Sequence, residues 1–230
     1  GMERTFKQFN QLILYNCKKI GENDMKIIEP SFEFMEDVNG ENILRKIEKA
    51  GRICYKSESN ISEHSAEKFI QNIIKRRHES VLEHGNISVK LICDRGVTHE
   101  IVRHRIASYS QESTRYCNYS ADKFGQEITV IKPCFWEEGS KEYAIWKESM
   151  EQIEKSYLAL LSLGAKPEQA RSILPNSLKT EIAITMNLRE WRHFFKLRTE
   201  LTAHPQMREI ACKMLLEFKQ RIPIVFDDIE

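Results

Sequence analysis

The stretch RHRIASYSQESTRY, residues 103–116, holds three arginines, one histidine, three serines and two tyrosines in the middle of the chain. Arginine presents a planar fork of N–H donors that matches phosphate or carboxylate. Serine hydroxyls can bind further oxygens of the same anion. If the end of the stretch is extended, Gln111, Ser113 and Arg115 share one face, because side chains alternate along an extended chain. The stretch therefore predicts a pocket for a small phosphorylated ligand.

Hydrophobic periodicity on both sides of this stretch predicts an α+β protein. The apolar pattern indicates helices over 41–55, 62–77, 96–105, 141–163, 189–197 and from His204 onward, a short helix within 166–178, and strands over 86–93, 127–132 and 179–187, with two more short strands within 25–38. Residues 117–126 read as a loop, and Ser62 is a candidate N-cap. Strict alternation of strand and helix is absent, so we expect a mixed or antiparallel sheet flanked by long helices.

The domain organisation follows from length and composition. With 230 residues and no linker rich in Gly, Pro or Ser, one domain over 25–230 is expected. Residues 1–24 are expected to be an N-terminal extension that includes a tag remnant at Gly1. The broad apolar face of the 141–163 helix is expected to pack on two sides or to meet another subunit.

Charge and cysteine usage exclude several classes of protein. The 35 basic and 34 acidic residues give a net charge of +1, which disfavours a bulk nucleic-acid binder. No apolar run reaches the roughly 20 residues that span a membrane. The six cysteines form no CxxC pair, which argues against a zinc ribbon or a redox dithiol. The N-terminus lacks the apolar h-region of a signal peptide, so we expect reduced thiols and a cytoplasmic location.

The segment HESVLEHG, residues 78–85, resembles a metalloprotease motif only superficially. A zincin needs two histidines four residues apart on one helical face, whereas His78 and His84 are six positions apart. Taken alone, the segment is typical of a helix C-terminus closed by Gly85. No metal site is predicted here.

Standard cofactor and nucleophile motifs are missing. The chain has no GxG pair, no P-loop and no GxSxG elbow. No cysteine lies in a recognisable nucleophile motif. Any cofactor must therefore be held without a Rossmann unit.

The pattern Arg103-His104-Arg105, seven residues, then Ser113 resembles the signature of the flavin-dependent thymidylate synthases. The resemblance extends over residues 25–225. It implies reductive methylation of dUMP to dTMP, with methylenetetrahydrofolate as the one-carbon donor and with FAD, reduced by NADPH, as the hydride source. It also implies a homotetramer with active sites at subunit interfaces.

The resemblance assigns roles residue by residue. The implied flavin contacts are His78, Ser80, Arg103, His104, Arg105, Gln111, Asn187, Arg189, His193 and His204. The implied dUMP contacts are Glu100, Arg103, Gln111, Glu112, Ser113, Thr114, Arg115, Arg171 and Arg198. His193 stands where some members have Asn, and Glu100 where some have Gln. By composition alone, Arg171 reads as a solvated helix arginine.

Arg198 is the predicted catalytic residue. It follows an apolar segment, where a guanidinium needs an anionic or carbonyl partner. The resemblance places it against the uracil ring, where it can stabilise the negative charge that develops as electron density is pushed toward C5. A cysteine nucleophile is then unnecessary, and Ser113 is a phosphate ligand.

Two other functions remain open on the residues alone. The basic and aromatic residues of 103–116 can form a nucleic-acid surface. Three histidines, His78, His84 and His104, can serve a metal-dependent hydrolase.

Overall fold

The computed structural model describes residues 25–115 and 127–230, which gather into two compact units interleaved along the chain. The first unit holds residues 25–29, 93–96, 112–115 and 127–180, and the second holds 30–92, 97–111 and 181–230. No single cut in the chain separates them, which agrees with the absence of a linker-like composition. The expected extension 1–24 and the expected loop 117–126 lie outside the described residues.

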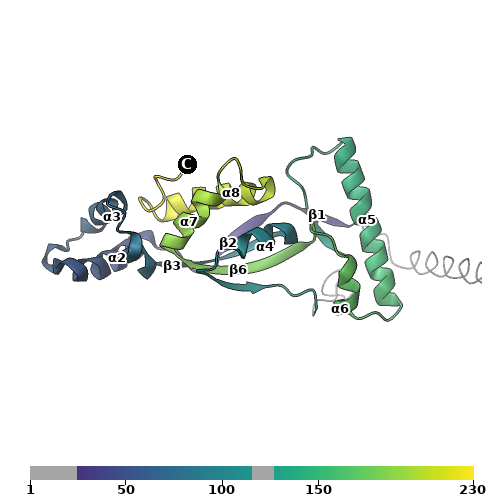
Figure 1. Ribbon diagram of the computed structural model, residues 1–230, viewed down its shortest axis with the longest axis horizontal. Coiled ribbons are helices and arrows are strands. Elements are labelled where there is room, and N and C mark those ends of the chain that lie inside the picture. Colours follow the sequence, from purple (N-terminus) through teal and green to yellow (C-terminus); the bar gives the residue numbers. More distant parts are fainter. Residues whose placement is uncertain (1–24, 116–126) are drawn as a thin grey trace, which may run out of the picture. The chain divides into compact units, whose positions relative to one another are not determined.

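The second unit is built on a four-stranded sheet in the order β2-β3-β6-β4. These strands are β2 (Ser31–Phe34), β3 (Asn86–Asp94), β6 (Lys179–Asn187) and β4 (Ser108–Gln111). The pairs β2–β3 and β4–β6 are antiparallel, with Phe32 opposite Leu91 and Gln111 opposite Ile182. Two helices, α7 (Leu188–Arg198) and α8 (Pro205–Arg221), cover one face of this sheet (Figure 1). The α+β architecture with antiparallel strands is therefore confirmed.

Aromatic side chains form the core between this sheet and its helices. Trp191, Phe194 and Phe195 of α7 pack with Phe218 of α8 and with Phe226, at ring-centroid distances of 5.0–5.7 Å. The indole N–H of Trp191 donates to the carbonyl of Ile87 at 3.1 Å, which fixes α7 on β3. The predicted apolar stripe of the last helix is buried throughout. Burial of this face orients α7 and, with it, the polar side chains on its other sides.

Two helices, α2 (Gly40–Tyr55) and α3 (Ser65–Lys75), and a 3₁₀ turn, η1 (Glu58–Asn60), precede β3. Asn39 caps α2 by accepting from the backbone N–H of Asn42 at 2.9 Å. The predicted Ser62 cap is wrong. The helix starts three residues later, and the Ser65 hydroxyl instead bonds the Ser62 backbone at 2.9 and 3.1 Å. His64 therefore takes the N-cap position of α3, without a side-chain cap bond.

The HESVLEHG segment forms a 3₁₀ helix, η2 (Glu79–His84), rather than the end of a longer helix. The chain turns at Arg77, whose φ of 57° is left-handed, and α3 has already ended. Gly85 does end a helix, as the C-cap of η2, but its φ of −95° is ordinary, so no left-handed conformation requires a glycine there. Its glycine identity has a packing reason: a Cβ there would lie 2.9 Å from Leu188 Cδ1.

The helix predicted over 96–105 is shorter than expected. The helix α4 (Arg95–Ile101) follows β3 directly, and a loop then carries Arg103 and His104 to β4. The Tyr109 hydroxyl donates to the carbonyls of Ile101, at 2.9 Å, and His104. Burial of this hydroxyl, together with the Glu190 charge, raises the pKa of Tyr109 to about 12, so it stays a donor. A side chain of β4 therefore holds the loop, a tertiary contact that periodicity does not reveal.

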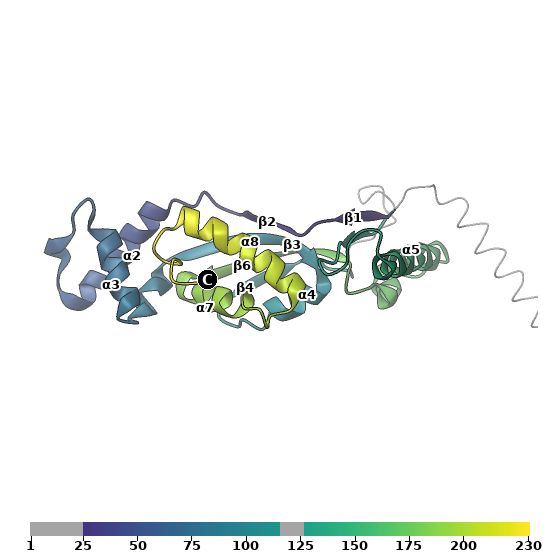
Figure 2. The ribbon, with the colours of Figure 1, turned by 90° about the horizontal axis from the view of Figure 1, so that it is seen from above.

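The first unit combines a small sheet with helices. Strands β1 (Lys26–Ile28) and β5 (Thr129–Ile131) pair in parallel. The long helix α5 (Lys141–Ser162) lies beside α6 (Pro167–Ala170) and the 3₁₀ turn η4 (Arg171–Ile173) (Figure 2). Trp146, Met150, Tyr157 and Leu158 of α5 are buried with Val130 and Leu178, whereas Ile145 is 66% exposed. Within the described residues, no helix has the length and apolar character that a bilayer crossing requires.

Candidate active site

Arg198, at the C-terminal end of α7, donates one hydrogen bond from each of its three guanidinium nitrogens within the second unit. Its Nε donates to His104 Nε2 at 3.0 Å. Its Nη1 donates to the Glu100 carboxylate at 2.8 Å, and its Nη2 to the Glu100 carbonyl at 3.0 Å. The predicted need for an anionic or carbonyl partner is thus met by both groups of one residue. Three simultaneous bonds fix the plane of the guanidinium.

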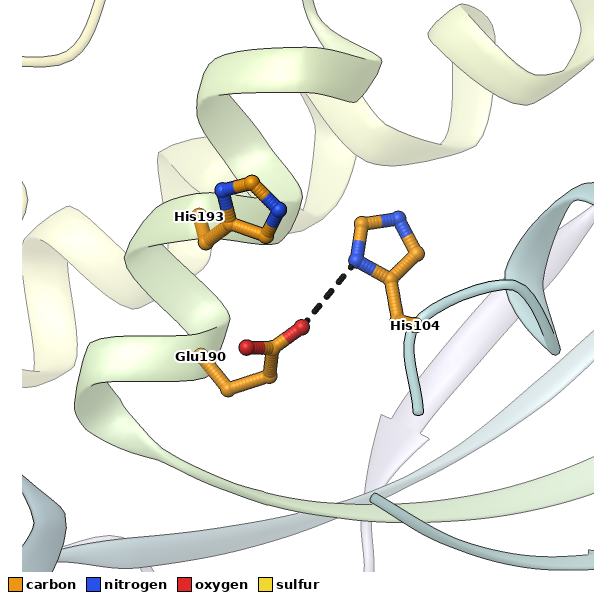
Figure 3. A group of neighbouring side chains, drawn as sticks. All are labelled: His104, Glu190 and His193. Carbon is orange, nitrogen blue, oxygen red and sulfur yellow. Dashed lines mark hydrogen bonds and ion pairs between the residues drawn. The ribbon is translucent and has the colours of Figure 1, made fainter. Parts of the chain in front are cut away.

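His104 is buried beside α7 and uses both ring nitrogens. Its Nδ1 lies 3.2 Å from Glu190 Oε1, and its ring packs edge-on against Phe194 at 5.0 Å (Figure 3). Burial, reinforced by the charges of Arg198 and His193, lowers the pKa of His104 to about 4. The ring is therefore neutral at pH 7, and its contact with Glu190 is a hydrogen bond rather than an ion pair.

Glu190 and His193, one helical turn apart on α7, point toward His104 (Figure 3). Ligand atoms of these three side chains lie within 4.8 Å of one another, a spacing that can hold a metal ion. However, Nε2 of His104 already accepts from Arg198, and Nδ1 already bonds Glu190. We therefore interpret Glu190, His104 and Arg198 as a hydrogen-bonded relay, beside which His193 packs edge-on against His104. The alternative triad of His78, His84 and His104 does not assemble among the described residues.

A cavity of about 480 Å³ opens next to this relay in the second unit. It is lined by Glu79, Glu83, Ile106, Asn187, Arg189, Glu190, Arg192, His193 and Lys196. Three of these, Asn187, Arg189 and His193, are predicted flavin contacts. The volume is within the range of small-molecule sites, and the side-chain amide, guanidinium and imidazole supply donors for a polar ligand.

Two of the cavity residues also serve the local fold. The Asn187 side-chain oxygen caps α7 by accepting from the Glu190 N–H at 2.9 Å, which leaves its amide N–H₂ for other partners. Arg189 forms an exposed ion pair with Glu83 at 2.7 Å. Because surface ion pairs are weak and screened, this guanidinium can exchange Glu83 for a ligand at little cost.

The remaining predicted flavin residues of this unit lie on loops and termini. His78 is exposed and shares a hydrogen bond with the Tyr55 hydroxyl at 2.9 Å, and Ser80 is exposed on η2. Arg103 and Arg105 flank the buried His104 and are both exposed, as expected for residues on either side of an anchor. His204 is exposed at the start of α8. Gln111 ends β4, and its amide donates to the Thr98 hydroxyl at 3.2 Å.

The predicted phosphate-binding segment belongs to the first unit. The Ser113 hydroxyl accepts from the Arg115 backbone N–H at 3.3 Å, in a turn that follows β4. The expected alternation of Gln111, Ser113 and Arg115 along one extended face is therefore wrong beyond Gln111, where the strand ends. Lys179 pairs with Glu112 at 3.1 Å and so neutralises a carboxylate that would repel phosphate. Thr114 is buried.

Arg171 also lies in the first unit. It is exposed at the junction of α6 and η4, within the segment 166–178 where a short helix was predicted. This exposure agrees with the interpretation of Arg171 as a solvated helix arginine, and it also leaves the guanidinium accessible to an anionic ligand.

Two residues with evident roles were not predicted from the sequence. Glu190 reads as an ordinary acidic residue in a first helical turn, and only the position of His104 reveals its partner. Arg192 is 1% exposed and donates to Asp228 at 2.6 and 2.8 Å, to the Val225 carbonyl and to Glu79 at 3.3 Å. Burial opposes the charge of Arg192, but these carboxylates outweigh it and raise its pKa. In the sequence, the Glu-x-x-His spacing of Glu190 and His193 was the signal that could have marked this turn of α7 as part of the site.

Comparison with known proteins shows the family to which this chain belongs. Residues 38–224 match the model of the Thy1 family, described as thymidylate synthase complementing protein, and the chain belongs to this family. A Pyrococcus furiosus relative named flavin-dependent thymidylate synthase is 41% identical over 172 residues, which are 74% of this chain and 70% of the relative. A Geobacter sulfurreducens relative of the same name is 35% identical, over 78% of each chain.

Solved structures share the fold. A UMP/dUMP methylase, PolB from Streptomyces cacaoi, bound with 5-Br UMP, aligns with a TM-score of 0.71 at 19% identity, over 89% of this chain and 96% of the other. The flavin-dependent thymidylate synthase ThyX from Helicobacter pylori, complexed with FAD and dUMP, gives 0.67 at 22% identity, over 88% and 99%. At these identities the likeness establishes the architecture.

Proposed function

We propose that this protein is a flavin-dependent thymidylate synthase that methylates dUMP to dTMP. The relative that shares 41% identity and carries this name supports the proposal most directly. The one-carbon donor is methylenetetrahydrofolate, and NADPH-reduced FAD is the hydride source. The working enzyme is a cytoplasmic homotetramer with active sites at subunit interfaces, and it acts on neither nucleic acid nor membranes.

The residues around the cavity fit a flavin. Asn187, Arg189 and His193 line its wall, and the free amide N–H₂ of Asn187 and the guanidinium of Arg189 suit the carbonyls of the flavin ring or the phosphates of the cofactor. His78, Ser80, Arg103, Arg105, Gln111 and His204 complete the proposed contacts. The flavin supplies the hydride, while the chain supplies position and electrostatic field.

Arg198 acts on the uracil. C5 attacks the one-carbon unit from an electron-rich, enolate-like pyrimidine, and a fixed guanidinium at the carbonyl and ring-nitrogen edge stabilises the negative charge of that form and so lowers the barrier. The three bonds to His104 and Glu100 supply that fixation before substrate arrives. Ser113, Thr114, Arg115 and Arg171 bind the phosphate, and Glu100, Arg103, Gln111 and Glu112 are the further dUMP contacts.

The visible spectrum and product analysis test this function together. Purified protein reconstituted with FAD should absorb in the flavin region, and with NADPH, methylenetetrahydrofolate and dUMP it should form dTMP. Ser113→Ala should weaken dUMP binding yet keep turnover at saturating dUMP, because the hydroxyl is a ligand and not a nucleophile. A protein that cannot take up FAD would exclude the proposal. Light scattering should give the mass of four chains.

A further inference from the structure

His104 has a tautomer that its neighbours dictate. The guanidinium Nε–H of Arg198 can only donate, so the Nε2 atom 3.0 Å away must offer a lone pair. In a neutral imidazole the other nitrogen then carries the proton, and Nδ1–H donates to Glu190 Oε1 at 3.2 Å. In the opposite tautomer, two N–H groups would face each other between His104 and Arg198. The Glu190 carboxylate accepts from Nδ1–H and so favours the tautomer in which Nε2 can accept from Arg198.

The surroundings hold this arrangement in place. Tyr109 anchors the backbone of His104, Phe194 packs against its ring, and α7 carries both Glu190 and Arg198 on one rigid element. Asn187 fixes the first turn of α7 through the backbone of Glu190. The relay therefore runs from the wall of the 480 Å³ cavity, which Glu190 lines, through a buried histidine to Arg198.

We propose that Glu190 is a positioning residue, which through the Nδ1–H of His104 keeps Nε2 as an acceptor and so orients Arg198 for the uracil. This inference rests on the proposed function, in which Arg198 contacts dUMP. Glu190 touches neither the uracil nor the reacting carbon. Its role resembles that of carboxylates that orient a histidine bound to another group, whose loss typically costs activity but not assembly.

Two variants of Glu190 separate orientation from mere packing. Glu190→Ala removes the acceptor and should lower kcat for dTMP formation by about 10- to 100-fold, the range seen when such orienting partners are lost. Glu190→Gln keeps an oxygen that can accept from Nδ1–H and should recover most of this activity. Glu217→Ala, which removes an exposed helical ion pair with Arg221 at 3.5 Å, is the matched control and should behave as wild type.

Combination with Arg198→Ala gives the decisive comparison. If Glu190 acts through Arg198, Glu190→Ala should have no further effect on kcat in the Arg198→Ala background, measured with labelled dUMP over long incubations. Flavin content and the rate of flavin reduction by NADPH should stay unchanged in Glu190→Ala. Additive losses of kcat, or a fall in flavin reduction that matches the fall in kcat, would overturn the proposal.

A measurement on the unaltered protein covers the case in which Glu190→Ala fails to fold. Long-range ¹H–¹⁵N spectra of ¹⁵N-histidine protein should show His104 protonated at Nδ1, with the signal assigned through its absence in His104→Gln. Protonation at Nε2 would overturn the proposal, as would activity that is lost to a chelator and restored by zinc. A wild-type protein that forms no dTMP would instead refute the proposed function, whereas an active wild type with an equally active Glu190→Ala refutes only the positioning role.

Discussion

Two arginines of α7 differ in burial and in partners: Arg192 lies in the middle of the helix, and Arg198, the proposed catalytic residue, lies at its end. Arg192 is fully buried and its guanidinium bonds Asp228, Glu79 and a backbone carbonyl. Arg198 bonds a neutral histidine and one partly exposed glutamate. Breaking the first set leaves the guanidinium of Arg192 buried without partners, whereas Arg198, whose side chain is 15% exposed, can exchange partners with a ligand. Burial and partners, and not the residue type, separate the structural cation Arg192 from Arg198, for which we propose a functional role.

Arg198→Ala should have the largest effect on activity. Loss of a fixed donor at the developing charge should reduce turnover at saturating dUMP by about 100- to 1,000-fold. The melting temperature should change little, because Glu100 is 39% exposed and stays hydrated. Arg189→Ala is the control and should reduce turnover far less. Similar losses from both variants would remove the distinction between Arg198 and other cations of α7.

Arg192→Ala should have the largest effect on stability. Removal of this buried side chain leaves a cavity, unpairs the Val225 carbonyl and takes the cation from Glu79, whose side chain is 21% exposed, and should reduce the free energy of unfolding by about 3 kcal/mol. Denaturant unfolding measures the change, and kcat per folded, flavin-loaded molecule should be retained. Glu79→Gln added to Arg192→Ala should return part of the stability. A kcat loss comparable to that of Arg198→Ala would contradict the comparison.

Acidification should weaken the region around Arg198 through His104. The folded-state pKa of His104 is lowered to about 4 from a usual 6.5. Between these values the unfolded state binds more protons than the folded state, so stability falls as pH drops from about 6.5 to about 4, by about 3 kcal/mol at its limit.

His104→Gln supplies the control for this pH dependence. The raised pKa of Glu190 acts in the opposite direction, because the folded state then takes up a proton more readily. The difference between wild type and His104→Gln, measured by unfolding at several pH values, isolates the histidine. Parallel curves for the two proteins would show that His104 is not held neutral.

The smallest expected effect belongs to the cap of α7. Asn187→Ala removes the acceptor for the Glu190 N–H and should cost about 1 kcal/mol of stability, whereas Asn187→Asp should keep the cap. Both variants lose the amide N–H₂ that faces the proposed flavin cavity, so both should bind FAD more weakly. Thermal melts and flavin titration separate the two roles. Equal FAD affinity in wild type and Asn187→Asp would limit Asn187 to capping.

Much of the fold could be read from the sequence because its signals are local. The alternation over 86–93 and 179–187 marks the two long strands, and the stripe from Met207 to Phe218 marks the last helix. The errors concern segments where tertiary contacts override local preference. The backbone of Ser62 bonds the Ser65 hydroxyl, and α3 begins only at Ser65. The chain leaves α4 after Ile101 because the Tyr109 hydroxyl, on β4, holds the loop.

For the site, the sequence by itself determined the composition: the cluster of arginines and serines in 103–116, the Arg-His-Arg pattern, and an arginine at 198 that needed a partner. Only the tertiary structure decided the pairings. Glu100, His104, Glu190 and Arg198 converge because the α4–β4 loop packs against α7, and which carboxylate meets which cation depends on that packing. Arg192 and Arg198 look alike in sequence, since burial and partners are properties of the folded chain.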